Sequence, residues 1–303
     1  MADETGMTDS VSKLSLQQSE PVGQNVMRTS SPAVRPDGDS SFDRLRREFE
    51  RGEVLRALTV VVPMYCESKR IGRTVETLAK SKLHRDGISF CFVDDGSADD
   101  TVAATRAAIR THQLSNAEVF PLERNLGKGG AVRAGILHVA CESHIVGYVD
   151  ADLSLDPAEL LTAVARMRLS NADVLVGERI VDLYKQPKLR RAASLVFRRV
   201  ATSMVPTGVQ DSQCAMKLFR SDVAISVFGP LVTNGFAFDV EILARLKLDR
   251  YAVRECPVLW QHQPGSQIAT GVDGFKMLRE LIAIRGVLRQ AEQTKAKSAG
   301  EHP

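Results

Sequence analysis

The stretch that decides the fold reads Leu58-Thr59-Val60-Val61-Val62-Pro63. Its mostly apolar, β-branched residues are typical of a strand that is buried on both faces of a parallel sheet. Proline then ends the run, because it has no backbone N–H to give to a neighbouring strand. We therefore expect a buried parallel strand at the start of the folded body.

Strands and helices alternate downstream of this run. Further strands are predicted at residues 88–93, 117–122, 144–149 and 174–177. The helices predicted between the strands cover residues 70–83, 99–112, 129–141 and 156–169. This alternation predicts an α/β fold: a mostly parallel, Rossmann-like sheet with helices on both faces.

Length and composition are those of a globular protein. The chain has 303 residues, of which 44% are hydrophobic and 25% are charged, and its net charge of +3 is too small to imply a nucleic-acid partner. No apolar run approaches the roughly 20 residues of a membrane span, and the polar N-terminus does not read as an export signal. The five cysteines are scattered without a C-x-x-C pair, which favours free thiols in a reducing cytoplasm. We expect a disordered or helical extension at 1–54, one domain at 55–270, and an amphipathic helix with a polar tail at 271–303.

Polar segments follow the predicted strands. They cover residues 63–67, 94–97, 150–154 and 178–179. In open α/β sheets, ligands bind beyond the carboxyl ends of the strands. The four segments together therefore predict a ligand site at one edge of the sheet.

Asp150 and Asp152 are the strongest candidates for a metal site. They lie two residues apart at the end of a strand, so an extended backbone points both side chains the same way. Two carboxylates held this close repel each other unless a cation joins them. Mg²⁺ or Mn²⁺ suits such a pair together with substrate phosphates, and the alternative is a solvated turn.

Asp94 and Asp95 end the second strand. Their carboxylates could accept hydrogen bonds from a base edge or from ribose hydroxyls. The alternative is a local role, with Ser97 or Asp99 capping the next helix. Both roles are compatible, because capping by Ser97 would leave Asp95 free.

The segment at 124–131 is rich in glycine and includes Lys128. Glycines let the backbone approach a ligand closely, and a helix N-terminus favours anions. The segment is not a P-loop, because Gly130 replaces the Ser or Thr after the lysine, and Val132 excludes the dinucleotide fingerprint. The alternative is a glycine-rich helix start with a purely structural role.

Residues 187–204 form an amphipathic pattern with a basic face. This helix could pack on the core with its basic face in solvent. It could also lie on an anionic membrane surface, with Arg190 and Arg191 addressing a lipid phosphate. Residues 275–288 are a second, weaker candidate for such a helix.

Two later segments, at 211–219 and 234–241, look like walls of a site. Asp239 lies in an apolar helix start, where a carboxylate needs a partner. It could act as a general base, or it could pair with Lys217 or an arginine, and we slightly favour the structural or orienting role. His262 could be a late metal or phosphate contact, although a lone histidine is more often neither.

In this order, the motifs resemble those of the inverting nucleotide-sugar glycosyltransferases of the GT-A fold, and among them the enzymes that glycosylate dolichyl or polyprenyl phosphate. The similar segments are Pro63-Met64-Tyr65-Cys66-Glu67, Val93-Asp94-Asp95-Gly96-Ser97, residues 124–131 and Asp150-Ala151-Asp152. Cys66 stands where the family has asparagine. The resemblance covers residues 58–267.

The second half of the chain is more similar to dolichyl-phosphate glucosyltransferases than to the mannosyl enzymes. This resemblance implies UDP-glucose as donor and a lipid phosphate as acceptor, at the cytoplasmic face of a membrane. Gln267 departs from the family, which has a basic residue there, and the N-terminal region is polar where the eukaryotic enzymes have a membrane span.

The resemblance also implies roles for individual residues. Asp150 and Asp152 would hold Mg²⁺ or Mn²⁺ on the donor diphosphate. The other donor-binding residues would be Pro63, Tyr65, Glu67, Asp94, Asp95, Lys128 and Ala151. The acceptor phosphate would be met by Arg179, Arg190 and Arg191.

Three alternatives stay open at this point. The first is a soluble glycosyltransferase with a sugar or small-molecule hydroxyl acceptor, for which Asp239 would be the base. The second is a GDP-mannose-dependent polyprenyl-phosphate mannosyltransferase. The third is an inactive nucleotide-sugar sensor.

Overall fold

The computed structural model describes residues 58–81, 83, 87–180, 205, 207–260 and 272–300, with side chains in the last range from 279 to 293. All of them belong to the compact unit Asp37–Pro303. Several predictions lie outside the described residues: the extension at 1–54, the basic helix at 187–204 with Arg190 and Arg191, and His262.

The sheet has seven strands in the order β3-β2-β1-β4-β6-β5-β7. The strands are β1 Leu58–Met64, β2 Ile88–Asp94, β3 Ala117–Pro121, β4 Ile145–Tyr148, β5 Val174–Ile180, β6 Lys217–Arg220 and β7 Val253–Leu259. β6 runs antiparallel to both its neighbours, whereas the other pairs are parallel. The predicted α/β fold with a mostly parallel sheet is confirmed, although β6 and β7 were not predicted.

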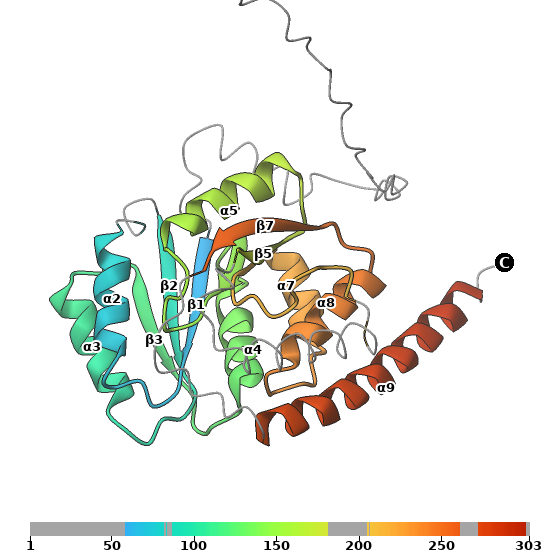
Figure 1. Cartoon of the computed structure of the whole chain (residues 1–303), viewed down its shortest axis with the longest axis horizontal. Helices are drawn as coiled ribbons and strands as arrows, with labels where there is room; N and C mark the ends of the chain where they lie inside the picture. Colours follow the sequence, from blue (N-terminus) through green and yellow to red (C-terminus); the bar gives the residue numbers. More distant parts are fainter. Residues whose placement is uncertain are drawn as a thin grey trace, which may run out of the picture. The chain divides into compact units, whose positions relative to one another are not determined.

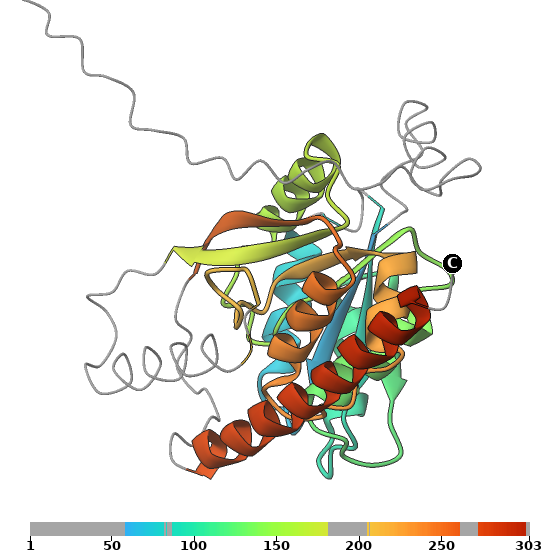
Figure 2. The ribbon, with the colours of Figure 1, turned by 90° about the vertical axis from the view of Figure 1, so that its right-hand side faces the viewer.

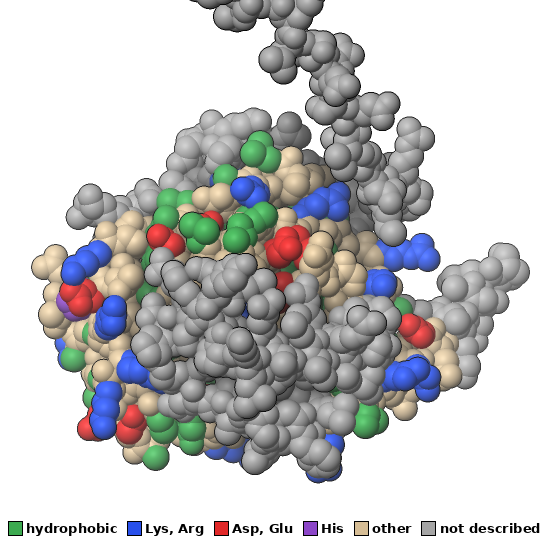
Figure 3. Space-filling view, viewed as in Figure 1, with side chains coloured by type: hydrophobic (Ala, Val, Ile, Leu, Met, Phe, Trp, Pro, Cys, Tyr) green, Lys and Arg blue, Asp and Glu red, His purple; other side chains and the backbone are tan. Residues whose placement is uncertain are grey.

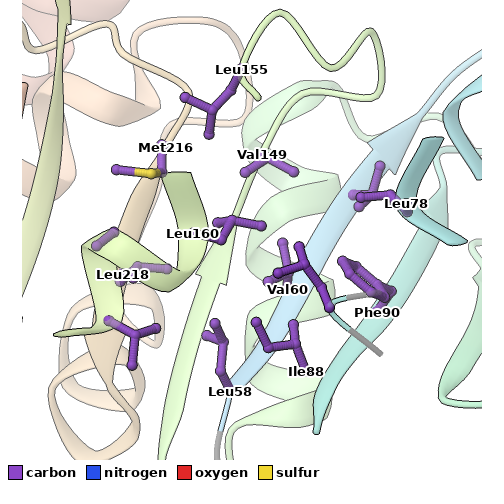
Figure 4. Packing of buried hydrophobic residues seen from close by; sticks show 14 of the residues in the cluster. Leu58, Val60, Leu78, Ile88, Phe90, Val149, Leu155, Leu160, Met216 and Leu218 are labelled. Atoms are coloured by element: carbon purple, nitrogen blue, oxygen red, sulfur yellow. The ribbon is translucent and has the colours of Figure 1, made fainter. Parts of the chain in front are cut away.

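Helices cover both faces of this sheet (Figure 1). They are α2 Ile71–Lys80, α3 Thr101–Thr111, α4 Lys128–Val139, α5 Ala158–Leu169, α7 Ser221–Phe228, α8 Phe238–Leu248 and α9 Val272–Gly300. Alternate residues of β1 face the two layers, as the pleat requires. Val60 packs in a cluster with residues of α2 and α5, and Val61 packs in a second cluster with residues of α4, α7 and α8. Figure 4 shows the first cluster, in which Val60 lies near Phe90 and Leu78.

α9 packs against α8, as Figure 2 shows. Leu281 and Ile284 are fully buried in a third cluster, with Val240 and Ala244 of α8. Ile282, Arg285 and Arg289 are exposed. The helix predicted at 275–288 therefore lies within α9, and its buried residues cover α8. Among the described residues, no helix is both long and apolar enough to cross a membrane.

Candidate active site

The carboxyl ends of β1, β2, β4 and β5 bring the predicted polar segments to one edge of the sheet. Met64 is the register partner of Asp94, and the backbone N–H of Asp95 donates to the Met64 carbonyl at 2.8 Å. β5 runs parallel to β4 because both are antiparallel to β6 between them. The shared direction places Arg179 at the same edge as Asp150.

The carboxylates of Asp94 and Asp95 are both occupied by nearby donors. Asp94 accepts from the hydroxyl of Ser97 at 2.6 Å and from its backbone N–H at 3.1 Å. Asp95 is 4% exposed and accepts from the backbone N–H groups of Leu126 at 2.7 Å and Gly127 at 2.9 Å. The expectation that Asp95 is left free was wrong, because the glycine-rich segment folds back onto it. Burial raises the pKa of the Asp95 carboxyl, although the two amides oppose this shift.

The loop after β1 is fastened to the loop after β2. The backbone N–H of Cys66 donates to the Ser97 hydroxyl at 2.8 Å, and that of Glu67 donates to the Thr101 hydroxyl at 2.8 Å. The N-cap position of α3 belongs to Asp100, and not to Ser97 or Asp99 as predicted, although the Asp99 carboxylate accepts from the backbone N–H of Thr101 at the start of the helix at 3.2 Å. Ser97 instead joins the two loops.

The residues predicted to line the donor site in the first loop differ in exposure. Tyr65 is 45% exposed, which leaves its ring open to solvent. Glu67 binds Arg70 through both carboxylate oxygens, at 2.6 and 2.8 Å. Burial raises the pKa of the Glu67 carboxyl, which Arg70 opposes. Pro63 is half-buried within β1.

The glycines at the start of α4 lie against the loop before α8. The backbone N–H groups of Gly129 and Gly130 donate to the Asn234 carbonyl at 2.8 and 3.2 Å. Gly127 has a φ of +85°, and a Cβ there would lie 2.7 Å from the same carbonyl oxygen. The structural role, named above as the alternative, is therefore the one that these contacts support. The prediction of an anion site at this helix N-terminus is wrong for the amides of Gly129 and Gly130, because both already donate to the Asn234 carbonyl.

Lys128 forms an ion pair with Asp150, with 2.6 Å between Nζ and Oδ1. Burial acts to lower the pKa of Lys128, but the nearby carboxylates of Asp150 and Asp239 outweigh it and raise the pKa. The ammonium is therefore charged in the folded chain. Within the part of the chain that the structure describes, Lys128 is the cation that forms an ion pair with one of the two predicted metal ligands.

The Asp150-Ala151-Asp152 turn presents oxygen atoms at the edge of the sheet. Asp152 is exposed, and its Oδ1 accepts from the backbone N–H of Ser154 at 3.0 Å. The Ala151 carbonyl accepts from the Thr74 hydroxyl at 2.6 Å, which holds the turn against α2. Leu153 has a φ of +46°, a left-handed conformation that few side chains adopt. These contacts fix the backbone and leave Asp152 pointing to solvent.

This turn fits a hard divalent cation that a substrate would help to bind. Among the described residues, no cluster of three or more His, Cys, Asp or Glu side chains could hold a metal alone. Mg²⁺ and Mn²⁺ suit one or two carboxylates, with phosphate oxygens and waters as further ligands. Asp150 and Asp152 supply such a pair.

Arg179 is held by Asp211 through a two-point contact. Its Nε and Nη2 donate to the two carboxylate oxygens at 2.7 and 2.9 Å, and its guanidinium lies 5.3 Å from the centre of the Trp260 ring. Burial acts to lower the pKa of Arg179, but Asp211 outweighs it and raises the pKa. Asp211 was predicted only as part of a site wall. It lies 32 residues after Arg179, so no local sequence pattern pairs the two residues.

Asp239 is buried in a network with Lys217 and Tyr148. Lys217 is 0% exposed and donates through Nζ to Asp239 Oδ1 at 2.6 Å. The Tyr148 hydroxyl donates to the same oxygen, and burial with the nearby Asp239 raises the Tyr148 pKa well above its usual range. The predicted pairing of Asp239 with Lys217 is confirmed. Two donors hold Oδ1, and Asp239 is 4% exposed, so the contacts and the burial favour the orienting role over the base.

The fold and the edge of the sheet define a class of enzyme. The sequence model of glycosyl transferase family 2 matches residues 59–228, which is more than half of the chain. The chain belongs to this family and is a glycosyltransferase. The resemblance stated from the motifs is thereby confirmed.

Its relatives narrow the class further. The dolichyl-phosphate beta-glucosyltransferase of Saccharomyces cerevisiae is 28% identical over 246 residues, which cover 75% of this chain and 74% of the relative. One from Trichomonas vaginalis is 30% identical over 240 residues, which cover 75% of this chain and 72% of the relative.

A solved structure shares the fold. The glucosyl-3-phosphoglycerate synthase of Mycobacterium tuberculosis, crystallised with Mn²⁺, UDP and glucosyl-3-phosphoglycerate, has a TM-score of 0.59 and 18% identity. The alignment covers 84% of this chain and 86% of that one. The likeness supports the α/β architecture described above.

Proposed function

We propose that this chain transfers glucose from UDP-glucose to dolichyl or polyprenyl phosphate, using Mg²⁺ or Mn²⁺. The names of the sequence relatives support the lipid-phosphate acceptor and the glucosyl group. The UDP and Mn²⁺ named for the neighbour of shared fold support the donor and the cation. The observation that carries the proposal is the meeting of Lys128, Asp150 and Asp152 at the carboxyl edge of the sheet.

The donor would be bound through its diphosphate. Asp150 and Asp152 would hold the cation, which when bound offsets the negative charge that builds on the leaving diphosphate. Lys128 would contact the diphosphate as a point charge. Pro63, Tyr65 and Glu67 would line the nucleoside pocket.

Asp94 and Asp95 would support donor binding indirectly, by positioning the loops around the site. Asp95 binds the backbone N–H groups of Leu126 and Gly127 and so fixes the segment that leads to Lys128, whereas Asp94 binds Ser97 and fixes its own loop. Direct contact of Asp94 and Asp95 with the nucleoside stays a prediction.

The acceptor is an anion and would need cations rather than a base. A phosphate oxygen of the lipid would attack C1 of glucose, the bond from C1 to the diphosphate would break, and UDP would leave with the electron pair. Arg179, oriented by Asp211, would steady the acceptor phosphate. Asp239 would orient Lys217 and Tyr148 in this scheme, because no proton has to be removed.

The enzyme would work at the cytoplasmic face of a membrane, without spanning it. The described part of α9 supports this proposal with an exposed face that carries Arg279, Ile282, Arg285 and Arg289. Basic and apolar side chains on one helix face favour an anionic bilayer surface.

The test uses the full chain with UDP-[¹⁴C]glucose, MnCl₂ and dolichyl phosphate in detergent. We expect label in the organic phase, and label that stays in water-soluble product would overturn the lipid acceptor. GDP-mannose in place of UDP-glucose tests the donor, and faster transfer from it would overturn the glucosyl proposal. Reactions without lipid and with excess EDTA are the controls.

A further inference from the structure

Glu280 of α9 reaches the loop that precedes α8. Its Oε2 accepts from the backbone N–H of Ala237 at 3.0 Å. Its carboxylate also lies so close to Gly235 that a Cβ at this position would overlap Oε1. Figures 1 and 2 show α9 running beside α8, where this contact is made.

The loop that Glu280 holds is shared by two helices of the site. The Asn234 carbonyl accepts from the first turn of α4, through Gly129 and Gly130. Ala237 is the N-cap of α8, whose first turn contains Asp239. One loop therefore fixes the start of the helix that begins with Lys128 and the start of the helix that carries Asp239.

Close packing leaves this loop little room to shift. A Cβ on Gly129 would lie 2.7 Å from the Phe238 Cβ, 2.8 Å from the Thr233 carbonyl and 2.9 Å from the Gly235 carbonyl. A movement of the loop would consequently be passed on to α4. The carboxylate of Glu280 also sits at the N-terminus of α8, where the helix dipole favours negative charge.

We propose that Glu280, which lies on a helix outside the sheet, is a positioning residue. It holds Lys128 and Asp239 in the places that turnover requires. It would act through the loop from Asn234 to Ala237, without touching the substrate. The proposal rests on the proposed function, because it takes Lys128 as the diphosphate contact. Misplacing a catalytic group by about 1 Å can cost about 100-fold in rate.

A double-mutant cycle of Glu280→Ala and Gly235→Ala tests the contact. Gly235 does not have a positive φ, so alanine suits its backbone. The three atoms nearest to a Cβ at Gly235 all belong to Glu280, so this methyl displaces the carboxylate in the single variant, and the double variant removes that overlap. We expect each single variant to lose about 10-fold in kcat and the double variant to lose no more than either, because coupled residues are not additive.

Two matched variants separate positioning from stability. Ile284→Ala opens a cavity in the same face of α9 and should lower Tm while kcat well below Tm stays the same. Glu280→Gln keeps the length and the acceptor oxygen, and it should restore kcat to within about 3-fold of wild type. In Glu280→Ala and Gly235→Ala, the KM for UDP-glucose should change less than kcat.

Hydrogen exchange gives a readout that does not depend on turnover. The amides of Gly129 and Gly130 should exchange faster in Glu280→Ala but not in Ile284→Ala, with the amides of β1 unchanged in both. Unchanged kcat in Glu280→Ala, unchanged exchange at Gly129 and Gly130, or additive losses in the cycle would each overturn the inference. An inactive wild type would instead contradict the proposed function, and the exchange experiment would still decide whether the contact holds the loop.

Discussion

The two halves of the sheet hold their acids in different ways. In the half built from β3, β2, β1 and β4, Asp94 and Asp95 at the carboxyl end of β2 bind backbone and hydroxyl groups. In the half built from β6, β5 and β7, Asp211 binds Arg179 and Asp239 binds Lys217. The acids at the end of β2 shape loops, whereas Asp211 and Asp239 orient cations.

The difference shows how a site can hold two anions side by side. In the half that contains β1, β2 and β4, Lys128 carries a positive charge beside Asp150. In the other half, the Asp211 carboxylate fixes the direction of Arg179. Asp150 and Asp152 lie in the turn that follows β4, the strand where the halves meet. A cation there would serve the diphosphate without burying an unpaired charge in either half.

The largest effect on turnover should come from replacing Asp152, which lies between the two halves. Asp152→Ala should lower metal-dependent turnover by about 100-fold or more, because a bound metal contributes several kcal/mol of transition-state stabilisation. The Tm should stay close to that of wild type, since the side chain is exposed. The measurement is initial rate against MnCl₂ concentration.

Asp156→Ala is the control for that variant. Asp156 is an exposed acid of the same loop, and it accepts from the Ala158 backbone N–H at 2.9 Å. It should keep its turnover. Full activity of Asp152→Ala, or of wild type in excess chelator, would remove the metal site from the scheme.

A large effect on stability is expected from breaking the buried ion pair between Asp239 and Lys217. Lys217→Met leaves Asp239 buried and unpaired, which should cost about 3–5 kcal/mol of unfolding free energy. Adding Asp239→Asn removes the unpaired charge and should recover part of this loss. Urea unfolding measures both, and a single variant as stable as wild type would show that the pair matters little.

The pH dependence of stability should differ between the halves. Burial raises the pKa of Asp95 above its ordinary value of 3.8, so the folded chain binds this proton more tightly than the unfolded chain. The contribution of Asp95 is present at low pH and is lost as the pH rises from about 3.8 through the folded pKa. The stability of wild type relative to Asp95→Asn should therefore fall over that window.

Asp211 should show the opposite trend. Burial acts to raise its pKa, but Arg179 outweighs burial and lowers it below 3.8. Its contribution is present above about 3.8 and is lost as the pH falls through the folded pKa. Urea midpoints of wild type, Asp95→Asn and Asp211→Asn over a pH series measure both trends, and equal slopes would contradict the contrast between the halves.

The smallest effect concerns the loop after β1. Cys66 has a φ of +52°, a conformation that asparagine adopts more readily than most residues. Cys66→Asn should therefore stabilise the fold by about 0.5 kcal/mol, a fraction of the 1–2 kcal/mol that left-handed backbone costs. Cys141→Asn, at an exposed cysteine without a positive φ, should bring no such gain. A loss of stability in Cys66→Asn would show that the thiol itself is needed.

Local patterns predicted the parallel half of the fold well. The β-branched run at Val60 and Val61 gave β1, and the short apolar segments gave β2 to β5, because buried parallel strands are apolar on both faces. β6 was missed since it is short and begins with a buried lysine, Lys217. β7 was missed because it contains charged residues and Pro257.

The contacts within the site were harder to predict than its location. Spacing placed Asp150, Asp152 and Asp95 at the correct edge of the sheet. It could not show that Asp95 binds the Leu126 and Gly127 amides, or that the Asn234 carbonyl takes those of Gly129 and Gly130. These partners come from distant segments, and only the tertiary fold brings them together.

The ion pair between Lys128 and Asp150 has a thermodynamic consequence. Each neutralises the other across 2.6 Å. If Asp150 bound a cation, Lys128 would lose its counterion and would become available to the diphosphate. We therefore expect Mn²⁺ and UDP to bind with positive heterotropic cooperativity, each raising the affinity for the other by the same factor, as linkage requires. Calorimetric titrations of UDP with and without Mn²⁺ that gave identical affinities would rule this out.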